Sequence, residues 1–554
     1  MNFKSGADGA ASTRLYASIL IGCLALAASI GSLSNGFAFD DVHVILKNTG
    51  LHTLNAPLNL ITGTYWPSEL GSMLYRPSTS VVFALQWAAG NGSALSFHLV
   101  SVALYVALSI AVYRLALVMM PQRAAVVAAA IFAAHPVHVE AVANIVGQAE
   151  LWVALIVVAL VHWFIHIRRH GRLKSHHLAA FTLGYFVACG FKEHAIILPA
   201  ILVAADFLVV GEKKTFERRA RDLLPLMIAM AIGGALFLAV RYAVLHGVAV
   251  DSRAAILRHG SFTTRIFTML SVVVEWVRLF VWPMSLSADY SYPRIRLHSG
   301  FEISMIPAVL VLLGTSWIGW TIRKRLSAAS FGISWMGIAL LIPSNILMVT
   351  GFVLAERTLM LPTVGFAICA GAAIDWALRQ SASRRPVLQT AGVVAIGLLI
   401  CGFTARSVTR NGVWRDNDRL FRQTVLDVPS SHRAHWMLAA HLKGTNRLPE
   451  ALEEMDLAVA LGDPKDPLLL AYAGDMFAMA NRCPRAVTLY RRALTLAPAN
   501  LRLRANTSHC LLVIGKLEEA KSVALSDTNA LSDREIQQIV HAIDSVALAR
   551  ARRM

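Results

Sequence analysis

Two adjacent carboxylates, Asp40 and Asp41, follow shortly after the first apolar stretch of the chain. Carboxylates at a lipid–water boundary are unfavourable near anionic headgroups and oppose each other's ionisation, so the pair indicates a functional site. A carboxylate in this position could act as a general base. A structural role is the alternative, in which one of the two caps a short helix that begins at Val42.

Other ionisable side chains lie at the ends of later apolar stretches, in the segments AAHPVHVE, FKEHA, LAERTLMLP and SADYSYPRIR. They include His135, His138, Glu140, Lys192, Glu193, His194, Asp289, Arg294, Glu356 and Arg357. Each alone is explained by helix capping or by a side chain that reaches the membrane surface. Together they indicate a site on one side of a membrane, because cations above apolar walls suit a phosphate whose lipid tail remains in the bilayer.

The elements that must position these residues are membrane spans. Hydrophobic residues make up 56% of the 554 residues and charged residues only 15%, whereas a globular domain carries about 25% charged residues. About eleven stretches approach the length that crosses a bilayer. They lie at 17–34, 95–118, 124–142, 148–167, 178–191, 195–210, 223–246, 303–322, 329–350, 358–378 and 387–405.

Basic loops set the expected topology. The net charge is +18, and most of the basic residues lie in alternate loops, for example Arg168, Arg169, Arg323 and Lys324. This distribution follows the positive-inside rule with a cytoplasmic N-terminus. It explains the positive charge by topology and disfavours nucleic-acid binding. The first stretch has no small-residue cleavage site and is expected to remain as a span. A first external loop then covers about 35–94, and the charged apolar stretch at about 263–283 is predicted to lie in the outer interface.

A period near 34 residues begins after residue 430. Small, aromatic and proline residues fall at tetratricopeptide-repeat positions, namely Gly474, Ala486, Tyr490, Ala493 and Pro498. A generic helical bundle is the alternative.

An odd number of spans after a cytoplasmic N-terminus predicts that this part is external. Five arginines between 406 and 422 argue for the cytoplasm, but long soluble domains translocate largely regardless of such charges. Cys483 and Cys510 would there be able to form a disulfide, or remain free thiols.

Eight segments, in order, resemble the transmembrane and tetratricopeptide-repeat protein O-mannosyltransferases and their bacterial relatives. They are FAFDDVHVILKN, YRPSTSVVFALQW, HPVHVEAVANIVGQAEL, GFKEHAIILP, LSADYS, LIPSNIL, AERTLMLPTVGF and VWRDNDRLFRQTV. The resemblance covers nearly the whole chain. It implies an all-α fold, with a GT-C-type glycosyltransferase bundle at 1–405, a linker helix at 406–430 and a repeat domain at 431–554.

The resemblance also implies site residues. The catalytic base would be in the pair Asp40 and Asp41, with Asp40 the first choice. The donor phosphate would contact cations, and the candidates are Arg357, Lys192, His135, His138 and His194, followed by Arg76 and Arg294. Glu140, Glu150, Glu193, Glu356 and Asp289 are further polar candidates. One departure is that Val146–Glu150 reads VGQAE where relatives often read SGRAD, which removes an arginine from this loop.

The expected function is inverting transfer of a hexose, with mannose as the candidate, from a polyprenyl phosphate to a hydroxyl of a protein or envelope glycan on the external face. Neither a metal nor another cofactor is expected, although carboxylates of Asp41, Glu140 and Glu150 would suit a divalent ion if their loops converge. The repeats would guide a polypeptide acceptor. A non-catalytic membrane scaffold is the alternative. Composition favours a bacterial inner membrane.

Overall fold

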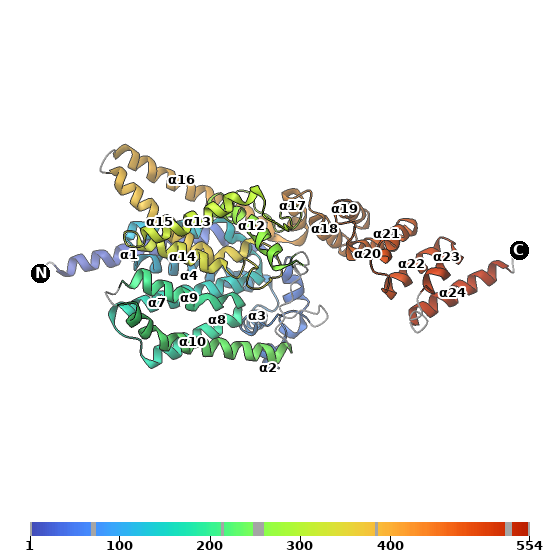
Figure 1. Cartoon of the computed structure of the whole chain (residues 1–554), viewed down its shortest axis with the longest axis horizontal. Coiled ribbons are helices and arrows are strands. Elements are labelled where there is room, and N and C mark those ends of the chain that lie inside the picture. Colours follow the sequence, from blue (N-terminus) through green and yellow to red (C-terminus); the bar gives the residue numbers. More distant parts are fainter. Residues whose placement is uncertain are drawn as a thin grey trace. The chain divides into compact units, whose positions relative to one another are not determined.

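A computed structural model describes residues 3–67, 74–211, 215–246, 257, 260–382, 386–526 and 534–551. These described residues form helices and no strand, as the all-α prediction requires. The chain divides into two compact units (Figure 1). The first comprises Met1–Ser291 and Ile295–Leu420, and the second comprises Tyr292–Arg294 and Phe421–Met554.

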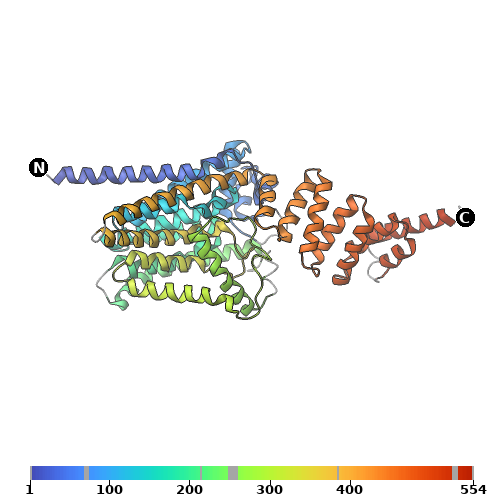
Figure 2. The same cartoon turned by 90° about the horizontal axis from the view of Figure 1, so that it is seen from above.

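The first unit is a bundle whose long helices run side by side (Figure 2). Its helices are α1 (Phe3–Ser29), α2 (Pro57–Thr62), α3 (Pro77–Gly90), α4 (Ala94–Leu117), α5 (Gln122–Ala134), α6 (Val139–Ala143), α7 (Gln148–His170), α8 (Ser175–Phe191), α9 (Leu198–Ala205), α10 (Phe216–Leu245), α12 (Phe262–Val281), α13 (Ile306–Ile322), α14 (Ser327–Leu340), α15 (Met360–Ala382) and α16 (Pro386–Asn411). The helix α17 (Asn417–Asp427) follows within the predicted linker.

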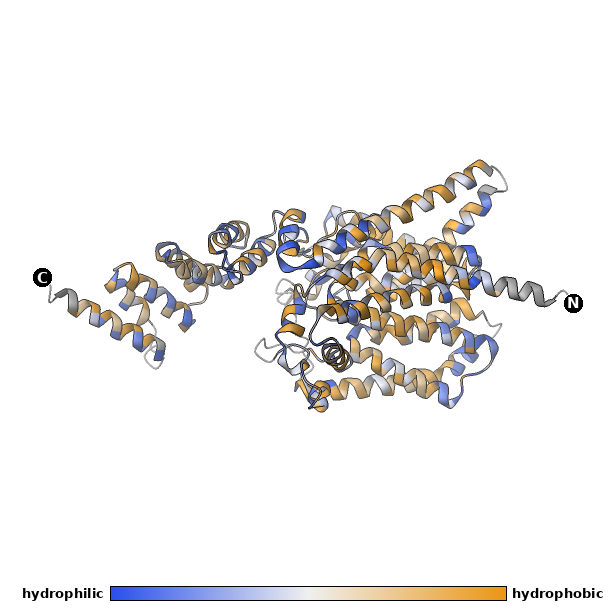
Figure 3. Cartoon of the chain, turned by 180° about the vertical axis from the view of Figure 1, so that it is seen from behind, coloured by the Kyte–Doolittle hydropathy of each residue, from blue (hydrophilic) through white to orange (hydrophobic). Residues whose placement is uncertain are grey.

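Eight helical segments of the described residues are long and apolar enough to cross a membrane, and a ninth forms if α5 and α6 are taken as one span bent by 47°. Hydrophobic residues, coloured orange, predominate along the long helices of the first unit in Figure 3. The chain is therefore an integral membrane protein. The two other expected spans are the shorter helices α8, with 17 residues, and α14, with 14 residues, so the count of eleven stays a prediction.

The helix α14 ends ten residues before the expected end of its span. Residues 341–350 form turns instead. Pro343 lacks an N–H, and Asn345 adopts a φ of +54° while its side chain accepts hydrogen bonds from the N–H and hydroxyl of Thr350 at 2.7 and 2.8 Å. The apolar composition of this stretch concealed the turn.

Small residues allow the central helices to pack closely. The helix α15 packs against α5 and α14, and α4 packs against α1, α5 and α7. A Cβ atom on Gly332 would lie 2.5 Å from the carbonyl oxygen of Gly365, and one on Gly371 would lie 2.7 Å from that of Ala124. Such contacts between small residues are typical of helix packing in membranes, where lipid gives no hydrophobic drive for association.

The second unit consists of helical pairs. Its helices are α18 (His432–Gly444), α19 (Leu448–Leu461), α20 (Pro467–Met479), α21 (Cys483–Leu496), α22 (Leu501–Val513), α23 (Leu517–Ala524) and α24 (Arg534–Ala551). The pairs α18/α19, α20/α21 and α22/α23 pack together. A Cβ atom on Gly474 would lie 2.5 Å from the ring of Tyr490, so this position requires glycine. The tetratricopeptide assignment itself stays a prediction.

Candidate active site

Asp40 and Asp41 lie in a turn with an unusual backbone. Phe39, the residue before them, has a φ of +56°, in the left-handed region that an aromatic residue rarely adopts. Its N–H donates to Oδ1 of Asn417 at 2.6 Å, and its ring lies edge-on to Trp414 with 6.3 Å between centroids. These two contacts hold the turn that carries both carboxylates.

Asp41 fastens this turn to the start of α7. Its fully buried carboxylate accepts from the N–H groups of Val146 at 2.8 Å, Ile145 at 3.1 Å and Ala38 at 3.4 Å. Burial raises the pKa of Asp41 to about 7, against the opposing effect of the backbone donors. The helix that begins at Val42 receives no side-chain cap from Asp41, so the capping alternative is wrong for this residue.

Asp40 is the more accessible carboxylate, with 26% of its side chain exposed. Its Oδ2 lies 3.6 Å from Nη2 of Arg357. The same guanidinium donates to Oε1 of Glu140 at 2.5 Å, and the backbone N–H of Arg357 donates to Oε2 of Glu140 at 3.0 Å. The start of the short helix η10 (Glu356–Leu359) is thus joined to α6, and Arg357 faces two carboxylates.

Lys192 and His194 meet Glu150 on α7. Lys192 forms an ion pair with Oε1 of Glu150, and Nε2 of His194 lies 3.3 Å from Oε2. Burial lowers the pKa of Lys192, although the nearby Glu150 opposes this effect. The glutamate of the VGQAE segment is therefore part of the cluster.

Glu193 connects two arginines. Its carboxylate lies 3.1 Å from Nη2 of Arg76 and 3.4 Å from Nη1 of Arg241. The guanidinium carbon of Arg76 also lies 5.0 Å from the ring centroid of Tyr65. Arg76, a weaker candidate in the sequence, therefore belongs to the same network of charges.

The charges of this ion cluster nearly balance. Its carboxylates are those of Asp40, Glu140, Glu150 and Glu193, and its cations are Arg76, Lys192, Arg241 and Arg357. Each cation has at least one carboxylate partner. An anionic ligand would consequently share or replace a carboxylate, and would not meet unpaired cations.

Glu356 and Asp289 hold the loop that follows α12. Oε1 of the buried Glu356 accepts from the N–H of Ser287 and the hydroxyl of Tyr290, both at 2.6 Å. Asp289 accepts from the N–H and hydroxyl of the nearby Ser291. These two carboxylates therefore position a loop beside η10. Arg294 lies in the segment Tyr292–Arg294, which groups with the second unit.

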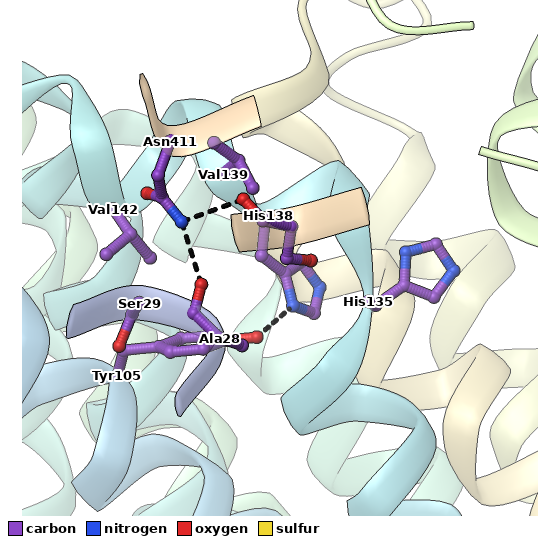
Figure 4. A pocket seen from close by; sticks show the side chains of 9 residues that line it. Ala28, Ser29, Tyr105, His135, His138, Val139, Val142 and Asn411 are labelled. Atoms are coloured by element: carbon purple, nitrogen blue, oxygen red, sulfur yellow. Dashed lines mark hydrogen bonds between the residues drawn. The ribbon is translucent and has the colours of Figure 1, made fainter. Parts of the chain in front are cut away.

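His135 and His138 lie within the bundle, where the chain bends between α5 and α6. His135 contacts the carbonyl of Phe280 at 3.0 Å, and Nδ1 of His138 contacts the hydroxyl of Tyr105 at 3.0 Å. The two rings line a small cavity (Figure 4). Its other lining residues are Ala28, Ser29, Tyr105, Val139, Val142, Ser407 and Asn411. Within the described part of the chain, neither histidine pairs with a residue of the ion cluster.

The carboxylates considered for a metal ion have other partners. Asp41 accepts from backbone N–H groups, Glu140 pairs with Arg357, and Glu150 pairs with Lys192. Among the described residues, no three histidine, cysteine, aspartate or glutamate side chains are grouped so that they could hold a metal ion.

Three residues of this region were not among the site residues predicted from the sequence. Arg241 lies inside an apolar helix, a signal that could have been used because ionisable residues in spans usually have a function. Asn417 lies in VWRDND, which was noted only as a point of resemblance. Tyr65 gave no signal, because an aromatic residue in an apolar loop is usual.

The chain is similar in sequence to known protein O-mannosyl-transferases. The chain is 29% identical to the protein O-mannosyl-transferase Tmtc1 of Drosophila melanogaster over 80% of its length, and 26% identical to the protein O-mannosyl-transferase TMTC4 of Homo sapiens over 77%. The resemblance to the protein O-mannosyl-transferases is confirmed. A similar protein of that name in Caenorhabditis elegans, F38B6.6, is 26% identical over 78% of the chain.

The alignments cover 61%, 64% and 60% of these three relatives, so the chain spans about three fifths of their length. No family model matches the chain.

Proposed function

We propose that the chain is an inverting glycosyltransferase that moves a hexose, with mannose as the candidate, from a polyprenyl phosphate to a hydroxyl of a protein or envelope glycan on the external face of the membrane. The observation that carries the proposal is a partly exposed carboxylate, Asp40, 3.6 Å from the guanidinium of Arg357, whose side chain is 12% exposed. The names of the relatives, all protein O-mannosyl-transferases, support the same class of reaction.

The arrangement assigns each group a task. Asp40 takes the proton of the acceptor hydroxyl, whose oxygen forms a bond to C1 of the sugar. The bond between C1 and the phosphate oxygen breaks on the opposite face, and its electron pair leaves with the polyprenyl phosphate. Arg357 and Lys192 stabilise the charge that develops on that phosphate. Their carboxylate partners Glu140 and Glu150 hold both cations in place before the donor binds.

Asp40 suits the base better than Asp41. The carboxylate of Asp41 is fully buried and is committed to backbone N–H groups, so a substrate hydroxyl cannot approach it without breaking those bonds. Asp40 keeps part of its surface open. The pair thus divides into a catalytic residue and a positioning residue.

The test is the variant Asp40→Asn, assayed by incorporation of labelled sugar in membranes at equal protein level. Loss of a general base predicts a fall of at least about 100-fold. Glu217→Gln, a loss of the same charge at an exposed position at the start of α10, is the control and should leave incorporation unchanged. Unaltered incorporation of labelled sugar in Asp40→Asn would contradict the proposed transferase function and favour a non-catalytic membrane scaffold.

A further inference from the structure

Tyr65 has a hydroxyl that the fold does not use. The side chain is 3% exposed, and its hydroxyl oxygen has no hydrogen-bond partner among the described residues. The ring packs in an apolar cluster that includes Val44 and Phe83, with Trp66 edge-on to it. A phenylalanine would fill the same space without burying a polar group, and an unsatisfied buried hydroxyl is destabilising. The hydroxyl is therefore available as a hydrogen-bond donor to a ligand.

The surroundings of Tyr65 identify what that ligand is. Arg76 lies 5.0 Å from the ring centroid, and the charges of Asp40, Asp41 and Arg357 all act on the phenol. Burial raises the pKa of Tyr65 above its ordinary value, so the group remains a protonated donor. A phenol donor with one arginine over its ring, and a second arginine whose charge acts on it, is complementary to an anionic oxygen.

We propose that the Tyr65 hydroxyl donates a hydrogen bond to a phosphate oxygen of the lipid-linked sugar donor, an inference that rests on the proposed function. The hydroxyl oxygen is covered by protein atoms. The phosphate consequently reaches it only when the atoms that cover the hydroxyl move aside. Tyr65 is then a donor-binding residue, distinct from the base Asp40 and from the cations that neutralise the phosphate.

The chain contains a matched control in Tyr113. This residue of α4 is 1% exposed, and its hydroxyl likewise has no partner among the described residues. Its ring packs in the main core of the bundle, in the group of helices that includes α4, α5 and α7. If a buried unpaired hydroxyl is only a packing imperfection, Tyr65→Phe and Tyr113→Phe should behave alike. If Tyr65 binds phosphate, only Tyr65→Phe should impair binding.

The experiment measures binding of sugar-free polyprenyl phosphate to the purified full chain, together with kcat, KM for the donor, and Tm. Tyr65→Phe should weaken that binding by about 10- to 100-fold and raise KM by a similar factor. The variant's Tm should equal or exceed that of the wild type, because the unpaired hydroxyl is gone. Tyr113→Phe should bind as the wild type does.

Binding of polyprenyl phosphate within twofold of the wild type in Tyr65→Phe would overturn the inference. So would a raised KM with unchanged binding of the sugar-free lipid, because the hydroxyl would then contact the sugar. If the wild type transfers no sugar but binds polyprenyl phosphate in a Tyr65-dependent way, the proposed transferase function fails and the inference about Tyr65 stands.

Discussion

Neighbouring residues of one type can have different tasks when the fold gives them different surroundings. Asp40 and Asp41 are adjacent in the chain, yet one lies partly open beside Arg357 and the other is enclosed by backbone N–H groups. Burial raises the pKa of Asp41, because desolvation of a carboxyl opposes its ionisation. The pair therefore consists of one partly accessible carboxylate and one that holds the turn to α7, and the two acids are not equivalent.

The raised pKa of Asp41 predicts a pH dependence of stability. In the unfolded chain this carboxyl ionises near pH 4, whereas in the folded chain it ionises near pH 7. Between these values the unfolded state loses its proton first, so the stability contributed by Asp41 falls as the pH rises. From pH 5 to pH 7 the free energy of unfolding should decrease by about 2 kcal/mol for this group alone.

Thermal unfolding of the wild type and of Asp41→Asn at pH 5 and pH 8 checks this prediction. The Tm of the wild type should fall more over this range than that of Asp41→Asn, which has no titrating group at this position. Asp40→Asn should keep the dependence of the wild type. Parallel curves for the wild type and Asp41→Asn would mean that Asp41 is already ionised at pH 5 in the folded chain.

Sequence reasoning found these carboxylates but not their partners. Position at a membrane boundary marked Asp40, Lys192 and Arg357, because ionisable residues there are rare enough to stand out. Their pairing depends on which loops meet, and no spacing in the sequence encodes it. His135 and His138 stood out equally, yet the bend between α5 and α6 places them in a cavity inside the bundle.

At the scale of elements, the short segment after α16 supports the turn that carries Asp40 and Asp41. The lengths of the apolar stretches predicted the long helices. The 3₁₀-helix η11 (Gly412–Arg415) and the start of α17 were marked in the sequence only by a segment that resembles the family. In the structure the N–H of Gly36 donates to the carbonyl of Arg415 at 2.9 Å, and Asn417 accepts from Phe39 at 2.6 Å. These bonds stabilise the left-handed backbone conformation of Phe39, which is otherwise unfavourable.

Asn417 is thus expected to be a positioning residue for Asp40. Asn417→Ala should release Phe39, move Asp40 away from Arg357 and lower kcat by about 10- to 100-fold, since small misplacements of a catalytic group reduce rates strongly. Binding of polyprenyl phosphate should change less, because Arg357 and Lys192 keep their partners. Asn417→Asp, which retains an acceptor oxygen, should restore part of kcat. Equal losses in kcat and in lipid binding would contradict the positioning role.

At the scale of the whole chain, the side of the membrane on which the second unit lies depends on the number of spans, since each added span reverses it. The parity of eleven spans supports external repeats, and the five arginines after residue 405 oppose them. The second unit itself contains a chemical reporter of its compartment. Sγ of Cys483 at the start of α21 lies 3.0 Å from Sγ of Cys510 in α22, and both residues are buried.

In an oxidising external compartment these thiols should form a disulfide by thiol–disulfide exchange with an oxidised dithiol protein. Alkylation of the denatured chain should then label Cys483 and Cys510 only after reduction, whereas Cys189 and Cys369 of the first unit should label without it. The bond would close a loop of 27 residues and stabilise the repeats by about 3 kcal/mol, so Cys483→Ser should lower their Tm. Labelling of both cysteines without reductant, in protein taken directly from membranes, would contradict the external placement.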